Sequence, residues 1–170
     1  VEQEGTYALP EAQIDRFLVK LVVGYPSKQE EMRIIDRMAG LSPHAQVQQA
    51  TSPEELLRMR KLLDTIYLDD KVKGYIVDLV FATREPEKVG LEKLKPLILY
   101  GASPRASLAL ARTSRARAFL EGRGFVTPQD VKAVGAMVLR HRVLTTYEAE
   151  AEGVTSEQVL QQVFDTVRVP

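Results

Sequence analysis

The sequence predicts a mostly α-helical protein, in which a helical bundle follows a short N-terminal turn and one strand. First, residues typical of helix N-caps repeatedly precede apolar residues at helical spacing. Second, the run most typical of a β-strand, residues 17–23, stands near the N-terminus. Third, 170 residues with 45% hydrophobic and 27% charged residues suit one globular domain of ordinary size, or a small domain plus a piece of another.

The first 25 residues differ from the rest. Pro10 at a first helical position predicts a single helical turn over residues 9–15. Residues 17–23 are rich in β-branched and large apolar side chains and stop at Gly24, which predicts one short strand. Because the backbone groups of a lone strand need partners, we expect its sheet to precede Val1, and we interpret the chain as a piece of a longer protein.

From Tyr25 on, the predicted elements are helices, each with its own start signal. Ser27 and Glu30 form a capping-box pattern, and Gly40 ends the helix that follows. The later starts combine a cap residue with a proline at the first position or with acidic residues in the first turn. They lie at Ser52, at Asp69 or Asp70, at Ser103, at Thr127 and at Thr155, and residues 41–51, 86–102 and 145–153 are predicted to be loops.

Charge and composition exclude several classes of protein. Lys and Arg number 23, as do Asp and Glu, so the zero net charge disfavours a diffusely basic nucleic-acid binder. Without cysteine there is no disulfide framework, thiolate metal site or cysteine nucleophile, which fits a cytoplasmic protein. No apolar run approaches the roughly 18 residues of a spanning helix, and no signal peptide is visible, so we expect no membrane partner.

A complete catalytic site is not expected in this chain. It has no G-x-x-x-x-G-K-[ST] sequence, and therefore no phosphate-binding P-loop. Its two histidines lack the spacing of metal ligands: we expect His44 in a solvated loop and His141 on a polar helix end. No Ser/His/Asp arrangement stands out, and no metal site is predicted.

Arg105 is the most informative candidate for a functional site. It lies in the first turn of a predicted helix, where a cation meets the positive end of the helix dipole and costs about 0.3–1 kcal/mol. One explanation is an anion, since free N–H groups at a helix start and a guanidinium together suit a phosphate, and Gly101 and Ala102 would let backbone approach closely. The alternative is an arginine whose stem packs on a neighbour while its charged end reaches solvent.

Arg16 is the second candidate, at the junction between the Pro10 turn and the predicted strand. It would project rigidly from the parent fold, or else form an ordinary local ion pair with little energetic effect. Further arginines follow Arg105, and for most of them we expect pairing with acidic residues of the bundle. A nucleic-acid reader on that helix is the alternative. These arginines are Arg112, Arg115, Arg117 and Arg123.

Several strings of residues together resemble the C-terminal part of a MoxR-family AAA+ ATPase. The most specific are L-P-E-A-Q-x-D-R-F over residues 9–17 and G-A-S-P-R-A over residues 101–106. The others lie at residues 2–7, 23–27, 82–85, 126–132 and 138–142, so the resemblance covers nearly the whole chain.

The resemblance implies a division of the chain and roles for its arginines. Residues 1–24 would be the end of an ATPase core whose Walker motifs lie upstream, and residues 25–170 would be its helical lid. Arg16 matches the position of the arginine finger and Arg105 that of the sensor-2 arginine. At the core–lid junction, Tyr25 and Pro26 would flank the adenine, although hinge packing explains them equally well.

The resemblance also implies cofactors and partners. The parent would bind ATP and Mg²⁺, form rings that are commonly hexameric, and remodel or mature partner proteins, often ones with a von Willebrand A domain. The fragment alone would be inactive and would bind no nucleotide tightly. The alternative is a stand-alone helical protein-interaction module without nucleotide chemistry.

Overall fold

The structure, a computed structural model, describes residues 9–40 and 47–170. His44 and the string at residues 2–7 lie outside these ranges. The chain divides into a larger unit, residues 1–20 with 61–170, and a smaller unit, residues 21–60. Its elements are α1 (Glu11–Ile14), α2 (Lys28–Met38), α3 (Pro53–Leu63), α4 (Asp70–Ala82), η1 (Pro86–Val89), η2 (Glu92–Leu97), β1 (Ile98–Tyr100), α5 (Pro104–Leu120), α6 (Pro128–Leu139), β2 (Leu144–Thr145), α7 (Tyr147–Ala151) and α8 (Ser156–Thr166), where η marks a 3₁₀ helix.

The predicted helix starts are confirmed, and their caps explain why. The side chains of Ser27, Asp69, Ser103, Thr127 and Thr155 each accept a hydrogen bond from a backbone N–H in the first turn that follows. Such a bond satisfies a donor that the helix itself leaves unpaired. The mostly helical fold predicted from the sequence is therefore confirmed. The capping residues and the spacing of apolar residues indicate the same helices.

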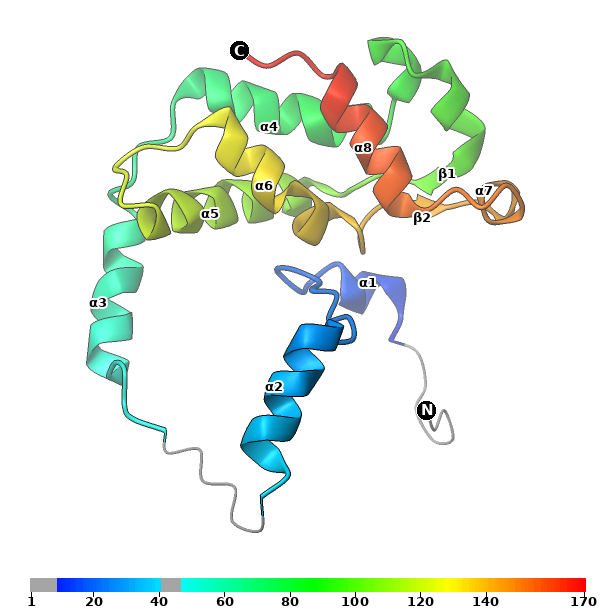
Figure 1. Ribbon diagram of the computed structural model, residues 1–170. Coiled ribbons are helices and arrows are strands. Elements are labelled where there is room, and N and C mark those ends of the chain that lie inside the picture. The colour runs from blue at the N-terminus through cyan, green and yellow to red at the C-terminus, as the bar shows by residue number, and fades with distance from the viewer. Residues whose placement is uncertain (1–8, 41–46) are drawn as a thin grey trace. The chain divides into compact units, whose positions relative to one another are not determined.

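The hydrophobic core of the larger unit lies among α4, α5, α6 and α8, which pack against one another (Figure 1). Gly135 of α6 faces the ring of Phe164 of α8 so closely that a Cβ atom there would lie 2.4 Å from Cζ of the ring. Because Gly135 has no side chain, α6 and α8 can approach at this point. Fully buried side chains from all four helices meet in the core, among them Leu79, Val80, Leu110, Val131, Val138, Val159 and Val163.

Two of the predicted loops, residues 86–102 and 145–153, contain regular structure. Residues 86–102 include η1, η2 and β1, and β1 pairs antiparallel with β2, Ile98 lying opposite Thr145. The short helix α7 follows at once, capped by Thr146. The loop prediction was wrong here because elements of two to six residues are too short to show an apolar period. Leu94 and Leu97 nevertheless join the core.

The predicted strand over residues 17–23 is not observed. The backbone is extended after a turn, but no strand hydrogen-bonds along it in the described part of the chain. Within the larger unit, Lys20 N–H donates to the carbonyl of Met137 at 2.8 Å. Strand-forming residues without a partner strand give an extended segment, because the pairing and not the composition makes the sheet.

The smaller unit contains α2 and most of α3. Both helices have the apolar spacing expected of amphipathic helices, yet neither contains a buried residue. The apolar side chains of α2, which are Met32, Ile34, Ile35 and Met38, are each at least half exposed. Their caps and acidic first turns account for the helices without a contribution from tertiary packing.

Candidate functional site

The start of α5 is fixed by the end of α4. The backbone N–H of Ala102 donates to Oγ1 of Thr83 at 2.9 Å, and Nε of Arg84 donates to the carbonyl of Ala102 at 2.6 Å. Gly101 lies so close that a Cβ atom there would stand 2.4 Å from the carbonyl oxygen of Thr83. The close approach expected at Gly101 therefore exists, but it is made to the protein's own backbone.

The backbone donors of the first turn of α5 are not free, contrary to our expectation. Pro104 has no N–H, Oγ of Ser103 accepts from Arg105 N–H at 3.3 Å, and the N–H of Ala106 bonds the Ser103 carbonyl at 2.9 Å. Oγ of Ser103 thus accepts the hydrogen bond that a bound phosphate would otherwise accept. The guanidinium of Arg105, rather than the helix end, is consequently the group here that could bind an anion.

Asp15 connects the N-terminal segment to α5 and to the end of α6. Its carboxylate accepts from Oγ of Ser103 at 3.0 Å and from Nη1 of Arg105 at 3.1 Å. From the other side, Nε of Arg142 donates to Oδ1 at 3.2 Å. Two arginines and one hydroxyl therefore converge on one carboxylate, and we call Asp15, Ser103, Arg105 and Arg142 the Asp15 cluster.

The Asp15 cluster carries one net positive charge, from two guanidinium groups and one carboxylate. Burial raises the pKa of the Asp15 carboxyl, but hydrogen bonds from Arg105 and Ser103 and the charge of Arg142 outweigh this and hold the pKa below its ordinary value. The carboxylate is thus ionised at neutral pH. The two arginines differ sharply, since the side chain of Arg142 is 2% exposed and that of Arg105 is 61% exposed.

Arg142 binds the turn that carries Arg16. Its guanidinium donates to the carbonyl oxygens of Asp15 at 3.0 Å, of Leu18 at 3.2 Å, and of Phe17, and also to that of Val138 on α6. A guanidinium can make so many bonds because its five N–H groups spread in one plane. It is almost completely buried because each of its nitrogens has an acceptor.

His141 does not lie on a polar helix end, as we expected, but is buried beside Arg142. Its Nε2 is 3.1 Å from the carbonyl oxygen of Phe17. Burial lowers the pKa of the imidazole, and the adjacent charge of Arg142 adds to this. The expectation was wrong because the segment around Phe17, more than 120 residues earlier in the chain, covers this helix end.

The other predicted site residues lie in different surroundings. Arg16 is exposed, next to Asp15, and its backbone N–H bonds the carbonyl of Gln13 at 3.1 Å. Tyr25 is 99% exposed, and Pro26 beside it is exposed as well. Both belong to the smaller unit, whereas Arg105 belongs to the larger one.

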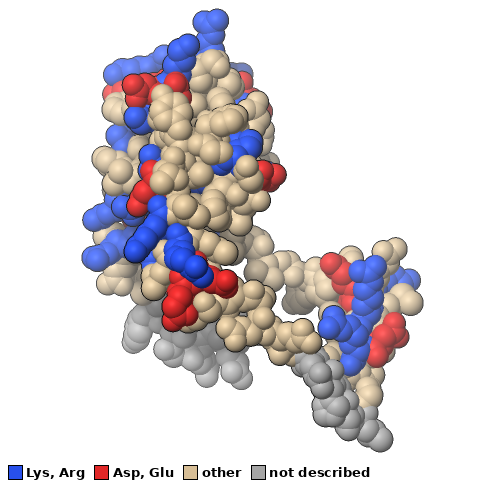
Figure 2. All heavy atoms as spheres, turned by 90° about the vertical axis from the view of Figure 1, so that its left-hand side faces the viewer, with Lys and Arg blue, Asp and Glu red and all other residues tan. Residues whose placement is uncertain are grey.

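A second carboxylate, Asp130, is bound by two of the further arginines. Arg123 donates to it through both Nη atoms, one of them at 2.8 Å from Oδ2, and Nε of Arg117 is 3.7 Å from Oδ1. The expected pairing with acidic residues of the bundle is thus confirmed for Arg117 and Arg123. No such pair forms for Arg112 and Arg115 in residues 9–40 and 47–170. Asp and Glu side chains lie among the Lys and Arg side chains on the face drawn in Figure 2.

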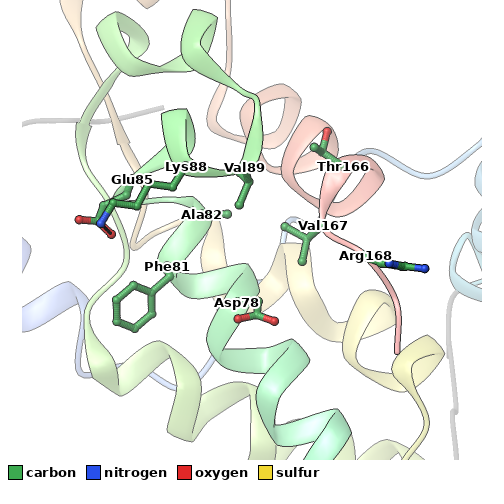
Figure 3. Close-up of a pocket in the computed structure, with 9 residues that line it drawn as sticks. All are labelled: Asp78, Phe81, Ala82, Glu85, Lys88, Val89, Thr166, Val167 and Arg168. Carbon is green, nitrogen blue, oxygen red and sulfur yellow. Dashed lines mark hydrogen bonds and ion pairs between the residues drawn. The ribbon is translucent and has the colours of Figure 1, made fainter.

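A shallow hollow of about 440 Å³ lies elsewhere in the larger unit, between the end of α4, η1 and the end of α8. Figure 3 shows Phe81 and the Glu85–Lys88 ion pair on one side and Val167 and Arg168 on the other. None of the predicted site residues lines it. The described ranges contain no cluster of side chains that could hold a metal ion. Within those same ranges, no helix combines the length and apolar character needed to cross a membrane.

The comparisons with known proteins agree with this architecture. Residues 93–163 match the family model of the AAA lid domain. Chaperone MoxR1 of Mycobacterium tuberculosis is 45% identical over 170 residues, the whole of this chain and 45% of that protein. Protein MoxR of Paracoccus denitrificans is 34% identical over 185 aligned residues, covering the whole of this chain and 53% of that protein.

A solved structure from Cytophaga hutchinsonii, described as a "putative ATPase", superposes with a TM-score of 0.94 at 40% identity. It is matched by the whole of this chain, which covers 52% of it. The helical fold and the matched segment therefore define an AAA lid domain with a further N-terminal segment. Over its whole length the chain is similar to MoxR proteins, and it spans about half the length of the curated relatives it matches.

Proposed function

We propose that this chain is the lid and arginine-finger portion of a ring-forming MoxR-type AAA+ ATPase. Residues 1–24 would complete the ATPase core and residues 25–170 would form the lid. In this proposal Arg105 contacts the nucleotide of its own subunit, and Arg16 reaches the nucleotide of a neighbouring subunit. The observation that carries it is the Asp15 cluster, where one arginine is exposed within a site of net positive charge.

The geometry of Arg105 suits contact with a phosphate. Nη1 bonds Asp15, while the other guanidinium nitrogens have no protein acceptor in the described ranges. Asp15 keeps its bonds to Ser103 and Arg142 if Arg105 turns away, so releasing Arg105 does not leave a buried carboxylate unpaired. The ATP and Mg²⁺ of the parent, held chiefly by residues outside this chain, would supply the phosphoryl group and the neutralising cation.

The geometry of Arg16 suits contact with a partner subunit. The carbonyls of Asp15 and Phe17, its two neighbours, are bonded by Arg142, whereas its own side chain is exposed. An arginine presented in this way compensates the charge that develops on phosphate oxygens during hydrolysis. In related NTPases such an arginine is worth roughly 10³–10⁵ in rate.

The larger assembly follows from the same proposal. Two relatives of this chain are named chaperone MoxR1 and protein MoxR. We propose a cytoplasmic ring, hexameric as is common in this family, that couples ATP hydrolysis to remodelling of partner proteins, with von Willebrand A domain proteins as a client class. Tyr25 and Pro26 would flank the adenine where the core meets the lid.

The test uses Arg16→Ala and Arg105→Ala in the full-length protein that contains this chain. Turnover of ATP should fall by about 10³-fold or more for Arg16→Ala, and sharply for Arg105→Ala, with circular dichroism and oligomeric state unchanged. Arg112→Ala is the matched control, because Arg112 is an exposed arginine on the same helix. Wild-type turnover in both site variants would contradict the proposal.

A further inference from the structure

We propose that Arg142 is a positioning residue for Arg16: it fixes the backbone on both sides of Arg16, and the reach of Arg16 to a neighbouring subunit depends on this contact. The inference rests on the proposed function of Arg16. It concerns a residue that touches no nucleotide, because Arg142 is almost completely buried.

The contacts of Arg142 enclose Arg16 along the chain. On the N-terminal side, Nη2 donates to the carbonyl of Asp15 at 3.0 Å and Nε to its carboxylate at 3.2 Å. On the C-terminal side, the carbonyls of Phe17 and Leu18 are bonded by Nη2 and Nη1. Arg142 therefore hydrogen-bonds three of the four residues from 15 to 18, and Arg16 is the one that it does not bond.

Arg142 is itself firmly anchored. Nη1 also bonds the carbonyl of Val138, one turn back on α6, and α6 packs on α5 and α8 in the core of the larger unit. The turn therefore takes its position from the core of the larger unit. Other contacts to this segment come from Ser103 and Arg105 on the Asp15 carboxylate and from His141 at the Phe17 carbonyl, but Arg142 alone bonds the backbone on both sides of Arg16.

A lysine could not replace Arg142 in this role. The acceptors lie on both sides of Arg16 and on α6, and only a planar fork of five donors reaches them together. An ammonium group has three donors on a single nitrogen, so it can keep the ion pair with Asp15 and lose the carbonyls. We therefore expect a rate defect with either Gln or Lys at this position.

Complementation between subunits separates positioning from simple stabilisation. An Arg142→Gln subunit keeps its own Arg105 but misplaces its Arg16, whereas an Arg105→Ala subunit keeps a well-placed Arg16. In co-assembled rings, the second subunit should supply Arg16 to the nucleotide of the first. Equal mixing should restore roughly a quarter of wild-type turnover, because a quarter of the interfaces then have the productive order.

The experiment measures ATP turnover of full-length Arg142→Gln, alone and mixed with Arg105→Ala. Alone, kcat should fall about 10²-fold, the effect of a displacement of about 1 Å, with little change in KM. Recovery in the mixture supports the inference. Arg140→Gln is the matched control, because Arg140 lies two residues before Arg142, at the C-cap of α6, and its side chain contacts the Ala136 carbonyl and Glu157 instead of residues 15–18.

Two results with the Arg142 variants would overturn the inference. If Arg142→Gln folds and loses activity but is not restored by mixing, its defect lies in its own nucleotide site. If both Arg142→Gln and Arg142→Lys unfold by circular dichroism, the residue acts on stability alone. A mixture of Arg16→Ala with Arg105→Ala serves as the reference: its failure to recover would reject the proposed role of Arg16 itself, whereas its recovery without that of Arg142→Gln rejects the inference alone.

Discussion

Asp15 and Asp130 occupy two sites of similar chemistry with different consequences. Each carboxylate is approached by two arginines and by one hydroxyl, from Ser103 or Thr127. For both, burial raises the pKa of the carboxyl, and hydrogen bonds from arginine and hydroxyl groups lower it further than burial raises it. Arg105 nevertheless lies in solvent and forms one ion pair, whereas Arg123 is held by two nitrogens and is 29% exposed.

The two sites differ in how far apart their members lie in the sequence. All partners of Asp130 lie within 13 residues of it, so this site closes the start of α6 on the end of α5. The partners of Asp15 lie 88 to 127 residues away and join the N-terminal segment to the start of α5 and to the turn after α6. The comparison teaches that a local cluster fixes a helix start, whereas a long-range cluster joins distant segments and here leaves the Arg105 side chain exposed.

The largest effect on stability is expected at Asp130. Asp130→Ala removes the partner of Arg123 and the N3 residue of a capping box, and its side chain is 3% exposed. Losing the bonds from Arg123 and the capping box at Thr127 should lower the free energy of unfolding by about 3 kcal/mol, measured by urea denaturation. Asp70→Ala is the control, since Asp70 is 93% exposed in its pair with Lys73 and should leave the midpoint nearly unchanged. Equal losses for both would reject Asp130 as a structural centre.

An intermediate effect on stability is expected at Gly101, which lies just before Ser103 and Arg105 of the Asp15 cluster and packs against the backbone of Thr83 and Arg84. Gly101→Ala pushes a Cβ atom against the backbone of Thr83 and Arg84, and should cost about 2 kcal/mol while displacing Ser103 and Arg105. Gly74→Ala, in the open middle of α4, is the matched control and should instead stabilise by about 0.5–1 kcal/mol. Thermal unfolding distinguishes the signs, and a stabilised Gly101→Ala would contradict the close contact.

The smallest effect is expected from Asp15→Asn, about 1 kcal/mol at neutral pH, because the hydrogen bonds to carbonyls by Arg142 remain. The folded pKa of Asp15 lies below its ordinary value of 3.8, so the carboxylate stabilises the fold above that pH. This contribution is lost as the pH falls through the folded pKa. The difference between wild type and Asp15→Asn should therefore shrink below about pH 4. A difference that grows on acidification would exclude the ion pairs as its source.

Local signals predicted the helices, and signals of the same kind account for the Asp130 site, which was not predicted. Thr127 and Asp130 are three residues apart and form their capping box whatever surrounds them, as do Ser27 and Glu30. The same logic places Arg105 in the first turn of α5. What depended on distant partners was not predicted: the β1–β2 pair, the lack of a strand after Phe17, and the burial of His141 and Arg142.

For the candidate site, the sequence indicated two arginines but not the residues that hold them. Arg16 and Arg105 stood out, the latter as a cation at the wrong end of a helix, and Asp15 proved to be the residue that joins Arg105 to Arg142. Nothing in the run Arg140-His141-Arg142 distinguishes the middle and last residues as buried, because charged residues at a helix end are ordinarily solvated. His141 and Arg142 are buried because the segment around Phe17 covers them. The period of apolar residues carries no information about such contacts between distant parts of the chain.

The contact at Gly101 has a consequence for protein engineering. The atoms that would meet a new side chain there belong to the peptide backbone of Thr83 and Arg84, and trimming neighbouring side chains creates no room. A mutant library that varies this position together with its neighbours and is selected for stability should therefore retain glycine at position 101. Gains in thermal resistance have to be sought at open positions such as Gly74.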